Sequence, residues 1–118
     1  MNINDYQKWT LTTAVYPDAG KGGFNEINYL VLGLASEAGE VAGKLKKIIR
    51  GDDVPPESFV SEVRDTLWYL ARICTVLGIS VEDLAAFNYN KLEARKANNT
   101  IKGSGDERKL VTVDSQCC

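Results

Sequence analysis

The amino-acid sequence predicts an all-α fold, a bundle-like arrangement of four helices. Apolar residues recur at spacings of three and four over long segments, and no segment alternates polar and apolar residues for long enough to form a sheet. Glycine and proline gather between these segments, where turns are expected. The 118 residues suffice for one domain with its own core. We place this domain at residues 1–102 and expect residues 103–118 to form a loop and a flexible tail.

The first two helices are bounded by clear turn signals. The first is expected from Asn4, as its N-cap, to about Ala14. The segment YPDAGKGG that follows lacks the residue order of a phosphate-binding loop, so we interpret it as a connector. The second helix is expected from about Asn25 to Ile49, with Gly51 as its C-terminal cap. Its apolar stripe consists of Ile27, Leu30, Val31, Leu34, Ala38, Val41, Leu45 and Ile48.

The last two helices follow the prolines of the segment RGDDVPP. The third is expected from near Pro55 to Leu77. Ser80, three residues before Asp83, forms a near capping box that opens a fourth helix, which continues to about Ala97. The apolar stripe of the third helix consists of Phe59, Val63, Leu67, Leu70, Ile73, Cys74 and Leu77.

Composition excludes several classes of function. The net charge of −2 and the pI near 5.1 argue against a general binder of nucleic-acid polymers or acidic membranes. No run approaches the ~20 apolar residues that span a bilayer, and the N-terminal residues lack the pattern of a signal peptide, so we expect a cytoplasmic protein. The three cysteines form neither a disulfide framework nor a zinc motif, and we interpret the terminal Cys117 and Cys118 as part of a frayed tail rather than a lipidation site.

Two pairs of acids flank the apolar stripes of the second and third helices. At ~100° per residue, Glu37 and Glu40 lie on one side of the first stripe, and Glu62 and Asp65 lie on the same side of the second. If the two stripes pack antiparallel, four carboxylates converge at the edge of the seam. They would repel one another by roughly several kcal/mol unless a cation neutralised them.

The kind of cation follows from the available ligands. The chain has no histidine, which removes the commonest transition-metal ligand and the commonest general base. Ligation by oxygen alone favours Mg²⁺, or else Mn²⁺, over zinc or iron. The alternative is that the acids are solvated flank residues paired with Lys44, Lys47 or Arg64.

Three separate blocks carry a resemblance to a known family. LGLASEAGEVAGKLKK, EVRDTLWYLARI and NYNKLEARKANNTIKGSGDER together resemble the MazG-like nucleoside triphosphate pyrophosphohydrolases, which are all-α, and especially their short single-domain members. The resemblance covers about residues 5–108. The family pattern is EExxE followed, after a spacer, by ExxD. Glu37 and Glu40 match the end of the first block, Glu62 and Asp65 match the second, and Ser36 replaces the first Glu of many members.

The resemblance implies hydrolysis of an NTP or dNTP between the α- and β-phosphates, giving a nucleoside monophosphate and pyrophosphate. Mg²⁺ held by the four acids would neutralise phosphate charge and lower the pKa of the attacking water. A carboxylate that does not ligate the ion could accept the proton of that water, and Glu40 is our candidate. Because Ser36 replaces an acid, the number of metal ions stays open.

Four further residues are candidates for substrate binding. Tyr69 is one helical turn beyond Asp65, and the resemblance implies contact with the sugar or base, with simple packing as the alternative. Asn88, Lys91 and Arg95 share one face of the fourth helix and match the basic motif of the family, which implies phosphate binding. A solvated basic face is the alternative there.

The resemblance also implies a homodimer or a homotetramer. Trp68 lies opposite the stripe of its helix, where a lone monomer would leave it in water, so we expect it at a subunit interface. Two other functions stay open at this point. One is a non-catalytic helical oligomerisation module, and the other is a phosphoribosyl-ATP pyrophosphohydrolase, an enzyme of the same superfamily.

Overall fold

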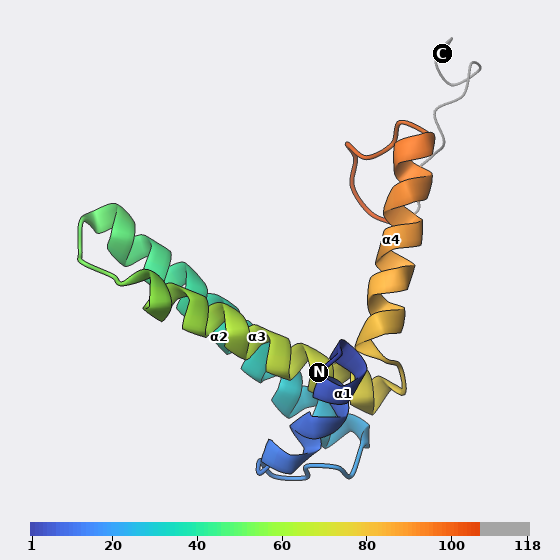
Figure 1. Cartoon of the computed structure of the whole chain (residues 1–118), viewed down its shortest axis with the longest axis horizontal. Coiled ribbons are helices and arrows are strands. Elements are labelled where there is room, and N and C mark those ends of the chain that lie inside the picture. The colour runs from blue at the N-terminus through green and yellow to red at the C-terminus, as the bar shows by residue number, and fades with distance from the viewer. Residues whose placement is uncertain (107–118) are drawn as a thin grey trace. The chain divides into compact units, whose positions relative to one another are not determined.

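The computed structural model describes residues 1–106, which form helices and no strand (Figure 1). The all-α prediction is therefore confirmed for these residues, whereas Cys117 and Cys118 lie outside them. Within the described range no helix has both the length and the apolar composition needed to cross a bilayer. The elements in order are α1 (Ile3–Trp9), the 3₁₀ turn η1 (Thr10–Thr13), α2 (Gly23–Arg50), α3 (Pro56–Leu77) and α4 (Val81–Ala97).

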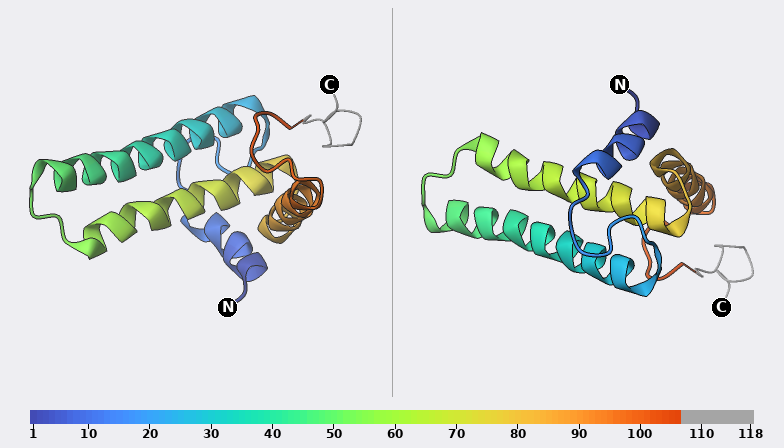
Figure 2. Two further views of the ribbon diagram at one scale, coloured as in Figure 1. Left: turned by 90° about the horizontal axis from the view of Figure 1, so that it is seen from above. Right: turned by 90° about the horizontal axis from the view of Figure 1, so that it is seen from below.

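The chain divides into two compact units, Met1–Glu82 and Asp83–Cys118. In the first unit, α2 and α3 lie side by side as a long antiparallel hairpin, and α1 and η1 pack against α3 (Figure 2). The predicted cap Gly51 is confirmed. It ends α2 with φ +96°, and its N–H donates to the carbonyl of Ile48.

The first helix differs from its prediction at both ends. Asn2 rather than Asn4 is the N-cap, because its side-chain oxygen accepts from the N–H of Asp5 at 2.8 Å. The α-helix also ends at Trp9 and continues as η1. The threonine hydroxyls there bond to carbonyls three residues earlier, Thr10 to Gln7 at 2.6 Å among them. Such local bonds compete with regular α-helix, which accounts for the tighter turn.

Only part of each apolar stripe is buried in the first unit. Leu30, Ala71 and Cys74 are enclosed between the helices. In contrast, Leu45 is 48% exposed and Val63 is 45% exposed, although both belong to the apolar stripes. A hairpin of two helices covers one sector of each helix, and a stripe wider than that sector stays in contact with water.

Trp68 does not lie uncovered on the surface. Its indole N–H donates to the hydroxyl of Thr13 at 2.8 Å, and its ring meets the ring of Tyr16 edge-on at 6.0 Å. The expectation that a single chain leaves Trp68 in water is therefore wrong, whereas its place at a subunit interface stays a prediction. Its own chain covers it, because η1 and the connector that follows return across this face of α3.

The second unit contains most of α4 and the loop at residues 98–106. Hydrogen bonds to the last carbonyls of the helix keep the loop close to its end. The backbone N–H of Thr100 donates to the carbonyl of Arg95 at 2.8 Å, and the side chain of Asn98 donates to the carbonyl of Ala94 at 2.8 Å. These contacts stop the helix near Ala97, as predicted.

Candidate metal and substrate site

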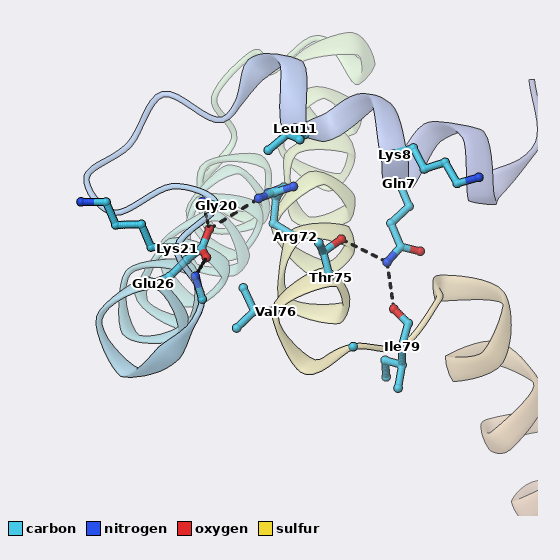
Figure 3. A pocket seen from close by; sticks show the side chains of 12 residues that line it. Gln7, Lys8, Leu11, Gly20, Lys21, Glu26, Arg72, Thr75, Val76 and Ile79 are labelled. Atoms are coloured by element: carbon cyan, nitrogen blue, oxygen red, sulfur yellow. Dashed lines mark hydrogen bonds and ion pairs between the residues drawn. The ribbon is translucent and has the colours of Figure 1, made fainter.

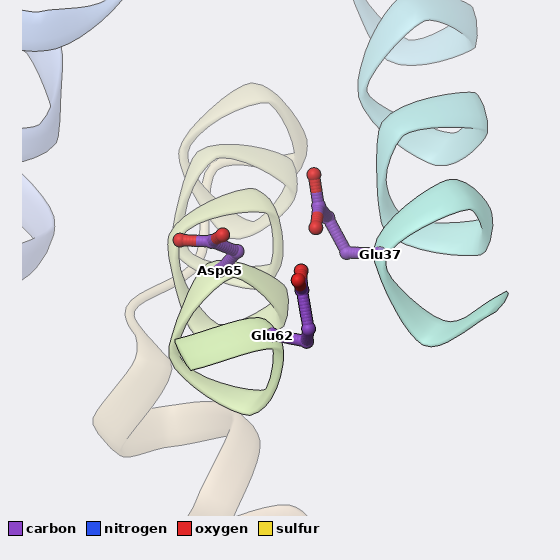
Figure 4. Close-up of side chains that lie close together, drawn as sticks. All are labelled: Glu37, Glu62 and Asp65. Carbon is purple, nitrogen blue, oxygen red and sulfur yellow. The ribbon is translucent and has the colours of Figure 1, made fainter. Parts of the chain in front are cut away.

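Three carboxylates from two helices meet on one flank of the hairpin. Glu37 extends from α2 toward Glu62 and Asp65, which are three residues apart on α3 (Figure 4). One carboxylate oxygen of each lies within 4.8 Å of those of the other two. We call these three residues the acid cluster. The helical spacing explains the convergence, because residues three apart occupy neighbouring turns of the same face.

The electrostatics of Glu37 reflect this crowding. Glu37 is half-buried, and burial raises the pKa of its carboxyl above the ordinary value. The charges of Asp65 and Glu62, a hydrogen bond with Glu62, and the charge of Glu40 raise that pKa further. The site therefore favours a proton or another cation on Glu37 over the bare negative charge.

Glu40 stands apart from the acid cluster. Among the described residues, the group of acids able to share one ion contains Glu37, Glu62 and Asp65, so three of the four predicted acids are brought together. Glu40 is exposed one turn farther along α2. Arg64 was one of the cations that could have paired with these acids. Its Nη2 instead lies 3.9 Å from Oε2 of Glu57.

An aromatic pocket adjoins the acid cluster. Its volume is about 360 Å³. Tyr69, which follows Asp65 by one helical turn, forms part of its wall, and the pKa of the Tyr69 hydroxyl is raised by burial, by Tyr29 and by the charges of Glu37 and Asp65. The charges of two cluster residues therefore act on a residue of the pocket wall, which means that the pocket and the cluster are neighbours. The lining residues are Thr13, Val15, Tyr16, Pro17, Tyr29, Trp68 and Tyr69.

The walls of this aromatic pocket are packed ring against ring. Tyr16 stacks on Tyr29 with ring centres 4.8 Å apart, and Trp68 meets Tyr69 edge-on at 5.1 Å. Tyr69 in turn lies on the backbone of Gly33 in α2. Of these residues, the sequence singled out Tyr69 for substrate contact and missed Tyr16, Tyr29 and Gly33. The position of Gly33 could have been recognised, because a glycine inside a helix often marks the close approach of another segment to the helix backbone.

A buried ion pair lies beside the aromatic pocket. Glu26 and Arg72 are each 1% exposed, and Oε2 of Glu26 lies 3.4 Å from Nη2 of Arg72 (Figure 3). Sequence reasoning missed this pair because its two members come from different helices. They also line a cavity of about 640 Å³ together with Gln7, Leu11 and Val76. None of the predicted site residues lines that cavity.

The three predicted residues of α4 belong to the second unit. Lys91 Nζ and Arg95 Nη2 both bind one oxygen of Asp106, at 3.1 and 2.9 Å. Hydrogen bonds from these two cations lower the pKa of the Asp106 carboxyl. The third residue, Asn88, is exposed. Lys91 and Arg95 are thus arranged so that both can hold one oxygen anion.

Over residues 1–106 the protein is all-helical, and two of its helices, packed antiparallel, bring three carboxylates to one flank. The chain is 37% identical over 114 residues to the Gene 37 protein of Mycobacterium phage L5, a match that covers 92% of this chain and 100% of the relative. The chain therefore belongs to the family of that phage protein. No protein-family model matches the chain, and no solved structure matches it.

Proposed function

We propose that this protein is a MazG-like, Mg²⁺-dependent nucleotide pyrophosphohydrolase. The observation that carries the proposal is the convergence of Glu37, Glu62 and Asp65 from α2 and α3. Those positions are the ones at which the sequence resembles the acidic blocks of the family. In this enzyme an NTP or dNTP is cleaved by water between its α- and β-phosphates, and a nucleoside monophosphate and pyrophosphate are released.

The residues of the acid cluster fit a magnesium ion. They offer oxygen ligands alone, the donor type that Mg²⁺ prefers, and an ion between them would relieve the crowding that raises the pKa of Glu37. Mn²⁺ suits the same ligands. When bound, the metal supplies positive charge for the phosphates and acidifies water. Glu37, Glu62 and Asp65 would hold it.

The exposed Glu40 is suited to a separate task. It stands outside the acid cluster but close enough for its charge to raise the pKa of Glu37. A carboxylate that does not ligate the metal keeps its lone pairs available to accept a proton. We assign Glu40 the acceptance of a proton from the attacking water.

The aromatic pocket would receive the sugar and base of the nucleotide. Its walls are tyrosine and tryptophan rings, which give flat apolar surfaces for stacking and hydroxyls for hydrogen bonds. Tyr69 stands where the pocket meets the acid cluster. A nucleotide whose phosphates lay at the carboxylates would therefore have its sugar at Tyr69. Asn88, Lys91 and Arg95 remain the candidates for phosphate binding.

We further propose that the active form is a homo-oligomer, a dimer or a tetramer. Large apolar side chains of α2 and α3 are exposed in the single chain, Leu32 at 71% and Ile49 at 78% among them. Large apolar side chains exposed in this way favour association with another subunit. Closed two-fold symmetry would cover the same surface on both subunits.

The proposal is tested by a pyrophosphate-release screen of the common NTPs and dNTPs, with Mg²⁺ and with EDTA. Turnover that requires Mg²⁺ supports it.

The exposed apolar helices also favour a second candidate, a helical oligomerisation module without activity. That candidate predicts assembly without turnover or nucleotide affinity, and including phosphoribosyl-ATP in the screen tests the related enzyme class.

A further inference from the structure

The buried pair Glu26 and Arg72 is connected to the aromatic pocket through one hydroxyl. The hydroxyl of Tyr16 donates to Oε2 of Glu26 at 2.6 Å and accepts from Nε of Arg72 at 3.2 Å. Both hydrogen-bonding directions of this hydroxyl are therefore used. The ring of Tyr16 belongs to the wall of the aromatic pocket.

Glu26 also holds the connector that precedes α2. Its two carboxylate oxygens accept from the backbone N–H of Gly20 at 2.8 Å and of Gly22 at 2.7 Å (Figure 3). Arg72 reaches a further element, because its Nη1 lies 3.5 Å from the hydroxyl of Thr10 in η1. The two residues of this ion pair thus contact the connector and η1, and they hold both segments in place beside α3.

Stability alone is a weak explanation for this ion pair. Desolvating two charges offsets most of their attraction, and apolar residues of similar volume often stabilise a protein equally well. What an apolar pair cannot do is fix the direction of a tyrosine hydroxyl. Here two bonds hold the Tyr16 oxygen in place, and the ring that carries it stacks on Tyr29 and lies edge-on to Trp68.

We infer that Glu26 and Arg72 are positioning residues for substrate binding, which they control by holding Tyr16 in the wall of the aromatic pocket. This inference rests on the proposed function. Neither residue belongs to the acid cluster, so their loss should weaken nucleotide binding while the hydrolytic step is preserved. The expected signature is a higher KM with kcat retained.

The variants are chosen to disturb the network without emptying the pocket. Glu26→Gln keeps the side-chain shape, but its NH₂ group cannot accept a hydrogen bond, so in either orientation of the amide at least one of the donors Tyr16, Gly20 and Gly22 loses its acceptor. Tyr16→Phe keeps the ring and removes the hydroxyl with its two hydrogen bonds, and because it leaves the ion pair in place it remains foldable if Glu26→Gln does not. Cys74→Ala is the control, because Cys74 is a buried side chain of α3 whose truncation lowers stability without touching Tyr16.

KM and kcat for the best nucleotide are measured for all four proteins, together with their melting temperatures. We expect KM to rise roughly fivefold to tenfold in Glu26→Gln and Tyr16→Phe, with kcat within about twofold of wild type. Cys74→Ala should melt earlier with an unchanged KM. An equal KM in the folded variants and the wild type, or a rise in KM that Cys74→Ala shares, would overturn the inference.

A binding measurement separates this inference from the proposed function. Tryptophan fluorescence is titrated with a nucleoside monophosphate in EDTA, and we expect weaker quenching in Tyr16→Phe than in wild type. A wild-type protein that neither hydrolyses nor binds any nucleotide would overturn both proposals. A wild-type protein that hydrolyses nucleotides, beside variants with unchanged KM and unchanged quenching, would overturn the positioning role alone.

Discussion

The ring of Tyr69 lies directly on the backbone of Gly33, so closely that a Cβ at position 33 would stand 2.1 Å from Cε1 of the ring. No side chain fits in that space. The contact brings α2 and α3 together beside the acid cluster and fixes where the Tyr69 hydroxyl can reach. Gly33 therefore controls the geometry of the proposed substrate site although it carries no functional group.

Gly33→Ala should raise KM and lower stability together. The added methyl must push Tyr69 away, and overpacking of this kind costs roughly 1–3 kcal/mol. Gly43→Ala is the matched control in the same helix, because a Cβ there meets nothing within 4 Å. It should instead stabilise the protein by about 0.5–1 kcal/mol. Urea unfolding and steady-state kinetics of both variants test this, and equal effects of the two substitutions would count against it.

Neutralising the acids should abolish turnover without unfolding the chain. For Glu37→Gln, Glu62→Gln, Asp65→Asn and Glu40→Gln we expect a loss of roughly 10²-fold or more in Mg²⁺-dependent pyrophosphate release. For the three cluster residues the reason is charge rather than shape, because an amide has the volume of a carboxyl group but cannot neutralise the ion. For Glu40 the reason is that an amide cannot accept the proton of the attacking water. Near-wild-type turnover in two of these variants would refute the site.

The three cluster variants should also be at least as stable as the wild type in EDTA. Each removes one negative charge from a group that repels itself, as the raised pKa of Glu37 indicates. Melting temperatures of the metal-free proteins provide the measurement. If Glu37→Gln, Glu62→Gln and Asp65→Asn all melted below the metal-free wild type, the acids could not be crowded as described.

The pH dependence of stability should contain a contribution from Glu26. Burial by itself would raise the pKa of this carboxyl, but hydrogen bonds from Tyr16 and two backbone N–H groups, together with the charge of Arg72, lower it overall. A carboxyl with a lower pKa in the folded state stabilises the protein above its unfolded pKa of ~4.3. That stability is lost as the pH falls through the folded pKa.

Denaturant unfolding between pH 3 and pH 7 measures this contribution. The free energy of unfolding of the wild type should decline in acid more steeply than that of Glu26→Gln, which cannot titrate at this position. At neutral pH the variant should be less stable by roughly 3 kcal/mol, because Arg72 is left without its anion. Parallel pH profiles for the two proteins would contradict a lowered pKa of Glu26.

Assembly should depend on the exposed apolar residues of α2. Leu32→Glu and Ile49→Glu should raise the dissociation constant of the oligomer about 10²-fold or more, because a charge would have to be buried at the interface. Both side chains are more than two-thirds exposed in the single chain, so its own fold should tolerate the change. Lys46→Glu controls for charge. Light scattering that showed an active monomer at micromolar concentration would refute the oligomer.

The helices and three of the four acids of the predicted cluster could be predicted because each acid follows the periodicity of its own helix, whereas Glu40 was expected in the cluster and lies outside it. The spacing of Glu62 and Asp65 on one turn, and the cap at Gly51, follow from the geometry of a single helix. Trp68 was misinterpreted because a helical projection contains only the residues of its own helix, whereas Thr13 and Tyr16 cover it from another segment. The ion pair of Glu26 and Arg72 escaped prediction for the same reason.

The most direct test of the central claim is ³¹P NMR of the products formed from a dNTP or NTP in Mg²⁺. The account predicts equal amounts of nucleoside monophosphate and pyrophosphate from the wild-type protein, and no products from Asp65→Asn or from the wild type in EDTA. Formation of nucleoside diphosphate and inorganic phosphate, or no reaction with any nucleotide, would contradict it.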